Sequence, residues 1–149
     1  MKLLIIGDSH GNIANLKHVM GFAKSINAVA VIHTGDWYNF DSIKIVKDYG
    51  IPLYTCIGNA DIDPRFKLEK SVKLEIDGIT IRVVHRPTKD YFQMAKDCSV
   101  VFTGHYHSQK EWEVDGIKII RPGALENGIN FAVFDTKTKV VEFINHDKS

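Results

Sequence analysis

The first sixty residues alternate short apolar runs with stretches that have helical spacing. Each apolar run is too short for a core helix and ends at a glycine or a polar residue, which is typical of a buried strand. Asn12 and Asp41 are suitable caps for the two helices between the runs. We predict strands over 1–6, 28–32 and 51–57 and helices over 13–26 and 41–48. This order requires right-handed crossovers and therefore a parallel sheet.

The second half of the chain has the pattern of hairpins. Asp77-Gly78 and Asp115-Gly116 are strong turn signals between alternating apolar residues. We predict strands over 71–76, 79–84, 99–102, 111–114, 117–120, 131–134 and 140–144, and a helix over 88–97. Parallel units followed by hairpins favour a mixed-sheet α/β fold. The 149 residues fit a single domain over 1–149, with Asp147 to Ser149 expected to fray.

Composition excludes several classes of protein. A net charge of +1 argues against a basic nucleic-acid-binding arm, and the apolar runs are too short to span a membrane. The start of the chain is too short for a signal peptide. Cys56 and Cys98 are far apart and form no metal or redox motif, so we expect buried thiols in a cytoplasmic protein.

Side chains capable of chemistry follow the predicted strands. They come from six separate segments and are Asp8, His10, Asp36, Asn59, Asp61, His85, His105 and His107. The carboxyl ends of parallel strands meet at one edge of a sheet, where ligands bind. Without Asp61, the set holds two carboxylates, one amide and four imidazoles. These donors suit divalent Mn, Fe, Zn, Co or Ni, and one bridging carboxylate would let them hold two ions. Such a pair is the clamp used for attack on phosphate esters.

These motifs, in this order, resemble those of the calcineurin-like metallophosphoesterases. They are Gly7-Asp8-Ser9-His10-Gly11, Gly35-Asp36, Gly58-Asn59-Ala60-Asp61, His85 and Gly104-His105-Tyr106-His107. The resemblance covers residues 3 to about 135. The short chain and Arg121-Pro122-Gly123-Ala124 resemble the compact bacterial and archaeal phosphodiesterase branch, which includes a retromer subunit of the same fold.

The resemblance implies a fold, a cofactor and residue roles. The fold would be two packed mixed β-sheets flanked by helices. The first ion would be held by Asp8, His10, Asp36 and His107, and the second by Asp36, Asn59, His85 and His105. Asp36 would bridge, and a metal-bridging hydroxide would attack phosphorus in line, with Asp36, Asn59 and His10 acting through it. Mn is the favoured metal, and the substrate would be a small phosphate ester.

The sequence departs from the family pattern at three positions. Ala60 stands where larger members have His and the compact branch has Cys, so we expect better activity on aryl than on alkyl esters. Arg86-Pro87 replaces the usual Gly-His after His85, and Arg86 could donate to a substrate phosphate. Ala124 replaces the usual Ser and removes one hydroxyl near the site.

Some residues keep two interpretations. Asp61 either orients a ligand or caps the segment at Asp63-Pro64. Trp37, in the aromatic segment 37–40, walls a substrate cleft, forms a dimer contact or simply packs. His33, beside Thr34-Gly35-Asp36, either supports the site or is a hydrogen-bonded core residue, and the second interpretation is favoured. His18 and His146 are expected to have no role in the site.

A metal-dependent phosphodiesterase is the first hypothesis for function. The second is a non-catalytic metal-binding scaffold like the retromer relative, which would not need all seven ligands. A nuclease or nucleotide phosphatase is the third, and the sequence shows no basic patch with interleaved aromatics beyond the thin set Lys67, Lys70 and Lys73. The compact branch also suggests a homodimer or tetramer.

Overall fold

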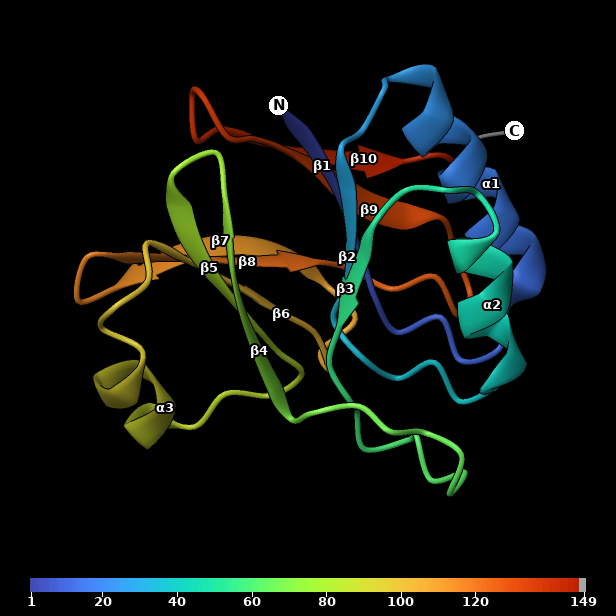
Figure 1. Cartoon of the computed structure of the whole chain (residues 1–149), viewed down its shortest axis with the longest axis horizontal. Coiled ribbons are helices and arrows are strands. Elements are labelled where there is room, and N and C mark those ends of the chain that lie inside the picture. Colours follow the sequence, from blue (N-terminus) through green and yellow to red (C-terminus); the bar gives the residue numbers. More distant parts are fainter. Residues whose placement is uncertain (148–149) are drawn as a thin grey trace.

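The computed structural model describes residues 1–147 as four layers (Figure 1). Two five-stranded mixed sheets pack on each other, with α1 and α2 outside one sheet and α3 outside the other. This is the predicted sandwich of two mixed sheets flanked by helices. Within the described residues, none of the helices is long and apolar enough to cross a membrane.

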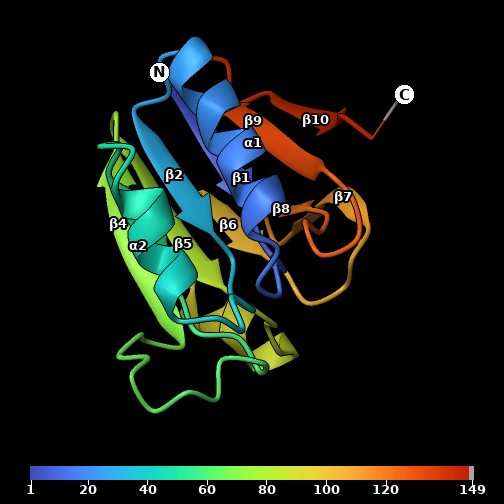
Figure 2. The ribbon, with the colours of Figure 1, turned by 90° about the vertical axis from the view of Figure 1, so that its right-hand side faces the viewer.

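The first sheet has the order β10-β9-β1-β2-β3, and its strands β1, β2 and β3 are parallel, as predicted. α1 and α2 lie side by side over it (Figure 2). The bounds are β1 Lys2–Ile6, α1 Ile13–Ser25, β2 Ala30–His33, α2 Asp41–Lys47, β3 Leu53–Thr55, β9 Asn130–Asp135 and β10 Val141–Asn145.

The second sheet has the order β4-β5-β6-β8-β7, with β5, β6 and β8 parallel. Both predicted Asp-Gly hairpins are present, as β4–β5 and β7–β8. The bounds are β4 Ser71–Ile76, β5 Ile79–Val84, α3 Lys89–Met94, β6 Val100–Thr103, β7 Gln109–Val114 and β8 Ile117–Pro122.

The core explains why β1 is apolar at every position from Leu3 to Ile6. Leu3 and Ile5 pack between the sheets, whereas Leu4 and Ile6 pack under α1 and α2. Successive side chains of a strand point to opposite faces, so a strand covered on both faces reads as a continuous apolar run. This doubly covered strand fixes the position of the loop that follows it.

β3 and α3 are shorter than predicted, and the bounds of the other elements agree with the predictions to within two residues at each end. β3 covers only Leu53–Thr55 because Pro52 has no N–H for a ladder and the Ile57 N–H donates to Glu69 instead. α3 is shorter than the predicted 88–97, and β7 begins at Gln109. At the end of the chain, the Asp147 carboxylate accepts from the Ile129 N–H at 2.6 Å, so Asp147 is anchored. The remaining residues of the fraying prediction, Lys148 and Ser149, lie outside the described residues.

Candidate metal centre

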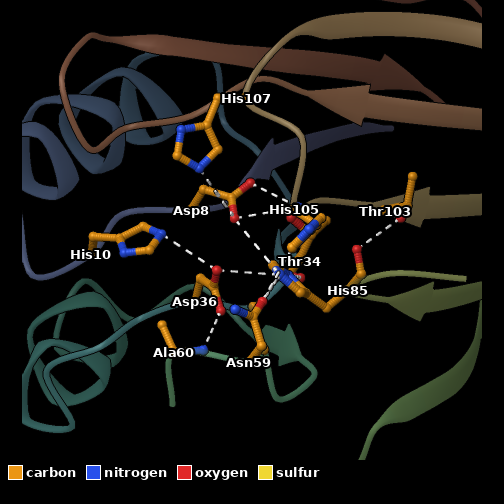
Figure 3. A network of polar contacts seen from close by, with 12 residues as sticks. Asp8, His10, Thr34, Asp36, Asn59, Ala60, His85, Thr103, His105 and His107 are labelled. Carbon is orange, nitrogen blue, oxygen red and sulfur yellow. Dashed lines mark hydrogen bonds and ion pairs between the residues drawn. The ribbon is translucent and has the colours of Figure 1, made fainter.

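Loops from both sheets converge at one edge of the sandwich (Figure 3). Four candidate ligands in these loops have left-handed backbone angles, with φ of 47° at Asp8, 44° at His10, 65° at Asp36 and 75° at His105. Such angles are unfavourable for residues with a side chain and persist where the surroundings enforce them. The chain therefore accepts backbone strain to aim these four side chains into one space.

The predicted ligands form two groups. Asp8, His10 and His107 make the first, and Asp36, His85 and His105 make the second. Within each group, one potential ligand atom from each residue lies within 4.8 Å of the others. The groups contain the residues that the resemblance implied for the first and the second ion, apart from Asp36 in the first set and Asn59 in the second.

The Asp36 carboxylate lies between the two groups. Its Oδ2 is 3.4 Å from Nε2 of His10 and 3.2 Å from Nε2 of His85. The amide oxygen of Asn59 lies 2.9 Å from Nε2 of His85 and 3.2 Å from Nδ1 of His105. Asn59 thus joins the second group, and all seven predicted ligands are in one place (Figure 3).

The donor set fits two divalent cations. The buried Nε2 of His10 has no hydrogen-bond partner among the described residues, although buried polar atoms are nearly always paired. Burial raises the pKa of Asp8 to about 7, with the neighbouring Asp36 adding to the rise, against the opposing effect of His85. A bound cation would give Nε2 of His10 a partner and would compensate the charge of the buried carboxylates.

Hydrogen bonds set the charge of the two central residues. Burial acts to raise the pKa of Asp36, but hydrogen bonds from His85 and the Ala60 N–H outweigh it and lower that pKa. Burial likewise opposes protonation of His85, and the bond to Asp36 outweighs it and raises its pKa. Nδ1 of His85 lies 2.8 Å from the carbonyl oxygen of Thr34, a contact that orients the ring. Asp36 is therefore an anion aimed at the centre.

Asp61 holds the ligand loops together from behind. Its Oδ2 accepts from the N–H of Asp36 at 3.0 Å and of Gly58 at 2.8 Å, and its Oδ1 accepts from the N–H of Tyr38 at 2.7 Å. The carboxylate is buried. Of its two interpretations, these contacts favour a residue that orients a ligand.

Trp37 does not contact a substrate, so the interpretation that it walls a substrate cleft is wrong. Its side chain is fully buried and stacks on His33 with the ring centroids 3.7 Å apart, while its indole N–H donates to Thr55. His33 in turn pairs with Ser9 at 3.0 Å, and burial keeps its pKa well below the usual range. These two rings are therefore packing behind the ligand loops.

One feature of the site escaped the sequence analysis. Glu126 lies 3.7 Å from Nδ1 of His107 and 4.0 Å from Nδ1 of His10, so it faces the outer nitrogens of the first group. It follows the motif at Pro122-Gly123, but no local pattern marks it. His18 and His146, which were expected to have no role in the site, pair with each other at 2.9 Å.

Cationic and aromatic side chains also contact one another beside the centre, an arrangement that the sequence did not indicate. Lys110 lies over the Trp112 ring at 4.8 Å, and Arg121 contacts the rings of Trp112 at 5.4 Å and Tyr106 at 5.3 Å. Arg86 also lies over the Tyr106 ring, 5.9 Å from its centroid. We call these five residues the cation–aromatic row. It begins beside His105 and His107.

Comparison with known proteins places this geometry in a family. The calcineurin-like phosphoesterase superfamily domain matches residues 1–139. The chain belongs to this superfamily. A phosphodiesterase of Methanocaldococcus jannaschii is 25% identical to it over 138 residues, which is 83% of each chain.

Solved structures agree on the fold of this phosphoesterase domain. An archaeal phosphodiesterase superposes with a TM-score of 0.84 at 24% identity, over 97% of this chain and 99% of the other. The vacuolar protein sorting 29 protein of Entamoeba histolytica, solved with Zn²⁺, superposes with a TM-score of 0.71 at 17% identity, over 97% and 99%. Enzymes and a sorting protein thus share the fold, so function has to be argued from the site.

Proposed function

We propose that the protein is a phosphodiesterase that uses two divalent ions, Mn²⁺ in the first instance, to hydrolyse a small phosphate diester. The position of the Asp36 carboxylate between two groups of nitrogen and oxygen donors carries this proposal. The family membership supports the reaction class, and the name of the archaeal relative favours a diester. All seven donors would be unnecessary for a purely structural role.

The residues of the site divide the work of such a reaction. The ions, when bound, would supply positive charge that polarises the phosphate ester and activates an attacking water. Asp8, His10, Asp36 and His107 would hold one ion, and Asp36, Asn59, His85 and His105 the other. Asp8 and Asp36 contribute −2 against +4, which leaves a cationic site in a chain of net charge +1. The exposed side chain of Arg86, beside His85, is free to donate to a phosphate oxygen.

Metal analysis with an assay on bis(p-nitrophenyl) phosphate tests the proposal. We expect turnover with Mn²⁺ and none with chelator. In Asp36→Asn the rate should fall by at least on the order of 100-fold, which is the upper end of the effect of residues that only support a ligand. Asp48→Asn is the control, because Asp48 is exposed and, within residues 1–147, forms an ion pair only with Lys44. Faster turnover of p-nitrophenyl phosphate would argue for a monoesterase.

Retained turnover in Asp36→Asn would contradict an enzyme of this kind. A folded, metal-binding protein that is inert with every divalent ion would support the scaffold hypothesis instead. The two results differ because the first is an active variant, whereas the second is an inactive wild-type protein that still binds metal.

The cation–aromatic row supports a second candidate function, action on the ends of single-stranded nucleic acid. Aromatic faces stack on bases and cations contact phosphates, and here both kinds alternate from the metal centre outward. A labelled oligonucleotide should bind in a salt-dependent way, and Trp112→Ala should weaken binding. Absence of binding at low salt would remove this candidate.

A further inference from the structure

A cavity of about 520 Å³ opens beside the candidate metal centre. Three of the proposed ligands, Asn59, His85 and His105, form one side of it. This volume lies within the range of small-molecule sites. A phosphate held at the centre would therefore have an adjoining space for one of its ester groups.

Part of the cavity lining is an apolar wall. It is formed by Ile57 after β3, Val84 at the end of β5, Pro87 after it, and Tyr91 of α3. The Tyr91 hydroxyl pairs with the Ser71 hydroxyl at 2.7 Å. Because this bond satisfies the polar end of Tyr91, its ring is left to serve as apolar surface.

The charges around the cavity favour an anion. Lys70 and Arg86 line it and are exposed, and the lining drawn from the described residues includes no carboxylate. A neutral apolar group alone would not use these cations, and a free phosphate would not use the apolar wall. The combination suits a phosphate that carries an aromatic or heterocyclic group.

We propose that this cavity selects phosphate esters with a ring as one ester group, either a simple aryl or a nucleoside, over esters of small alkyl groups. The inference rests on the proposed function, since it takes the phosphate to lie at the metal centre. Arg86-Pro87, which replaces the family's usual Gly-His, supplies two of the lining residues. The selectivity is therefore a property of this chain's own sequence.

Equilibrium binding tests the proposal without any need for turnover. Calorimetry on the Mn²⁺-loaded protein would compare phenyl phosphate, thymidine 5′-phosphate and methyl phosphate. We expect at least one ring-bearing ligand to bind about tenfold or more tightly than methyl phosphate, because the ring removes apolar surface from water. The stronger of the two ring-bearing ligands identifies the aryl or the nucleoside as the preferred source.

Variants of Tyr91 test whether its ring causes the preference for ring-bearing phosphates. Tyr91→Ala removes the ring and should reduce the preference to about threefold or less, whereas Tyr91→Phe keeps the ring and should retain it. Phe92→Ala is the control for α3, because Phe92 contacts Tyr91 but does not line the cavity. Melting temperatures of all three would show that each variant is folded.

Two results would overturn the inference. One is binding of all three phosphates within twofold of each other, and the other is an equal loss of affinity for ring-bearing and methyl phosphate in Tyr91→Ala. Either could occur in an active, metal-dependent phosphodiesterase, so the proposed function would stand. Conversely, an inactive protein that still prefers the ring would contradict only the proposed function.

Discussion

At the scale of single residues, Asp61 shapes the centre without being one of its seven donors. Asn at this position keeps the volume but replaces one acceptor oxygen with an NH₂ group that faces backbone N–H donors. We expect Asp61→Asn to weaken Mn²⁺ binding about 10–100-fold, since groups that orient ligands have effects of this size. Calorimetric titration of the metal measures it. Asp63→Asn, at an exposed pair with Arg65, is the control, and equal affinities in all three proteins would contradict the assigned role.

The methyl side chain of Ala60 provides no proton donor for a leaving group. Its backbone N–H donates to Asp36 at 2.8 Å, which fixes the place of a side chain at this position near the centre. An imidazole there could protonate a poor leaving group, so Ala60→His should raise the alkyl-to-aryl rate ratio about tenfold or more. Ala60→Leu adds bulk without a proton donor and serves as the control. An unchanged ratio, measured with methyl and p-nitrophenyl esters, would remove the idea.

At the scale of elements, the sequence predicted the features that depend on residues close together in the chain, such as helix caps and hairpin turns. Asn12 caps α1, as predicted, by accepting from the Asn15 N–H. Asp77 and Asp115 adopt left-handed angles in the two hairpin turns. The candidate ligands likewise follow strand ends, because the order of strands and helices places those ends at one edge.

The elements and contacts that the sequence did not predict depend on partners far along the chain. Glu126 reaches the site because Asn15 of α1 donates to the carbonyls of Leu125 and Gly128, 110 and 113 residues away. In the cation–aromatic row, the predicted β7–β8 hairpin sets Lys110 opposite Arg121, but the contact of Arg86 with Tyr106 depends on the pairing of β5 with β6. No periodicity or motif encodes such a contact before the sheets are assembled.

The loops that follow the strands differ from helices in their tolerance of a methyl group. A Cβ at Gly58 would collide with the backbone and carboxylate of Asp36, whereas at Gly21, on the exposed side of α1, it meets open space among the described residues. Gly58→Ala should therefore lose Mn²⁺ affinity by about tenfold or more. Gly21→Ala should leave affinity unchanged and raise stability by about 0.5–1 kcal/mol. Metal titration and thermal unfolding test both, and an unaffected Gly58→Ala would show that the loop has room to adjust.

At the scale of the whole molecule, the sandwich explains how a nearly neutral chain can attract a phosphate. Both sheets end their parallel strands at one edge, so donors separated by up to about a hundred residues share a small, half-buried space. The fold also places the carboxylates of Asp8 and Asp36 close together, where they repel each other. Bound cations would reverse this repulsion, which couples metal binding to the stability of the entire domain.

That coupling predicts that the difference in stability between wild type and Asp8→Asn depends on pH without metal and changes sign when metal is added. The folded state raises the pKa of Asp8 from 3.8 to about 7, so between these values it holds a proton that the unfolded chain has released. The free energy of unfolding contributed by Asp8 therefore falls as the pH rises through this window. Without metal, Asp8→Asn should gain stability relative to wild type by a few kcal/mol, about 1.4 per unit of pKa, from pH 4 to 8. With Mn²⁺ at pH 8, wild type should become the more stable protein. Denaturant unfolding with chelator or with Mn²⁺ measures both differences, and a pH-independent gap would contradict the coupling.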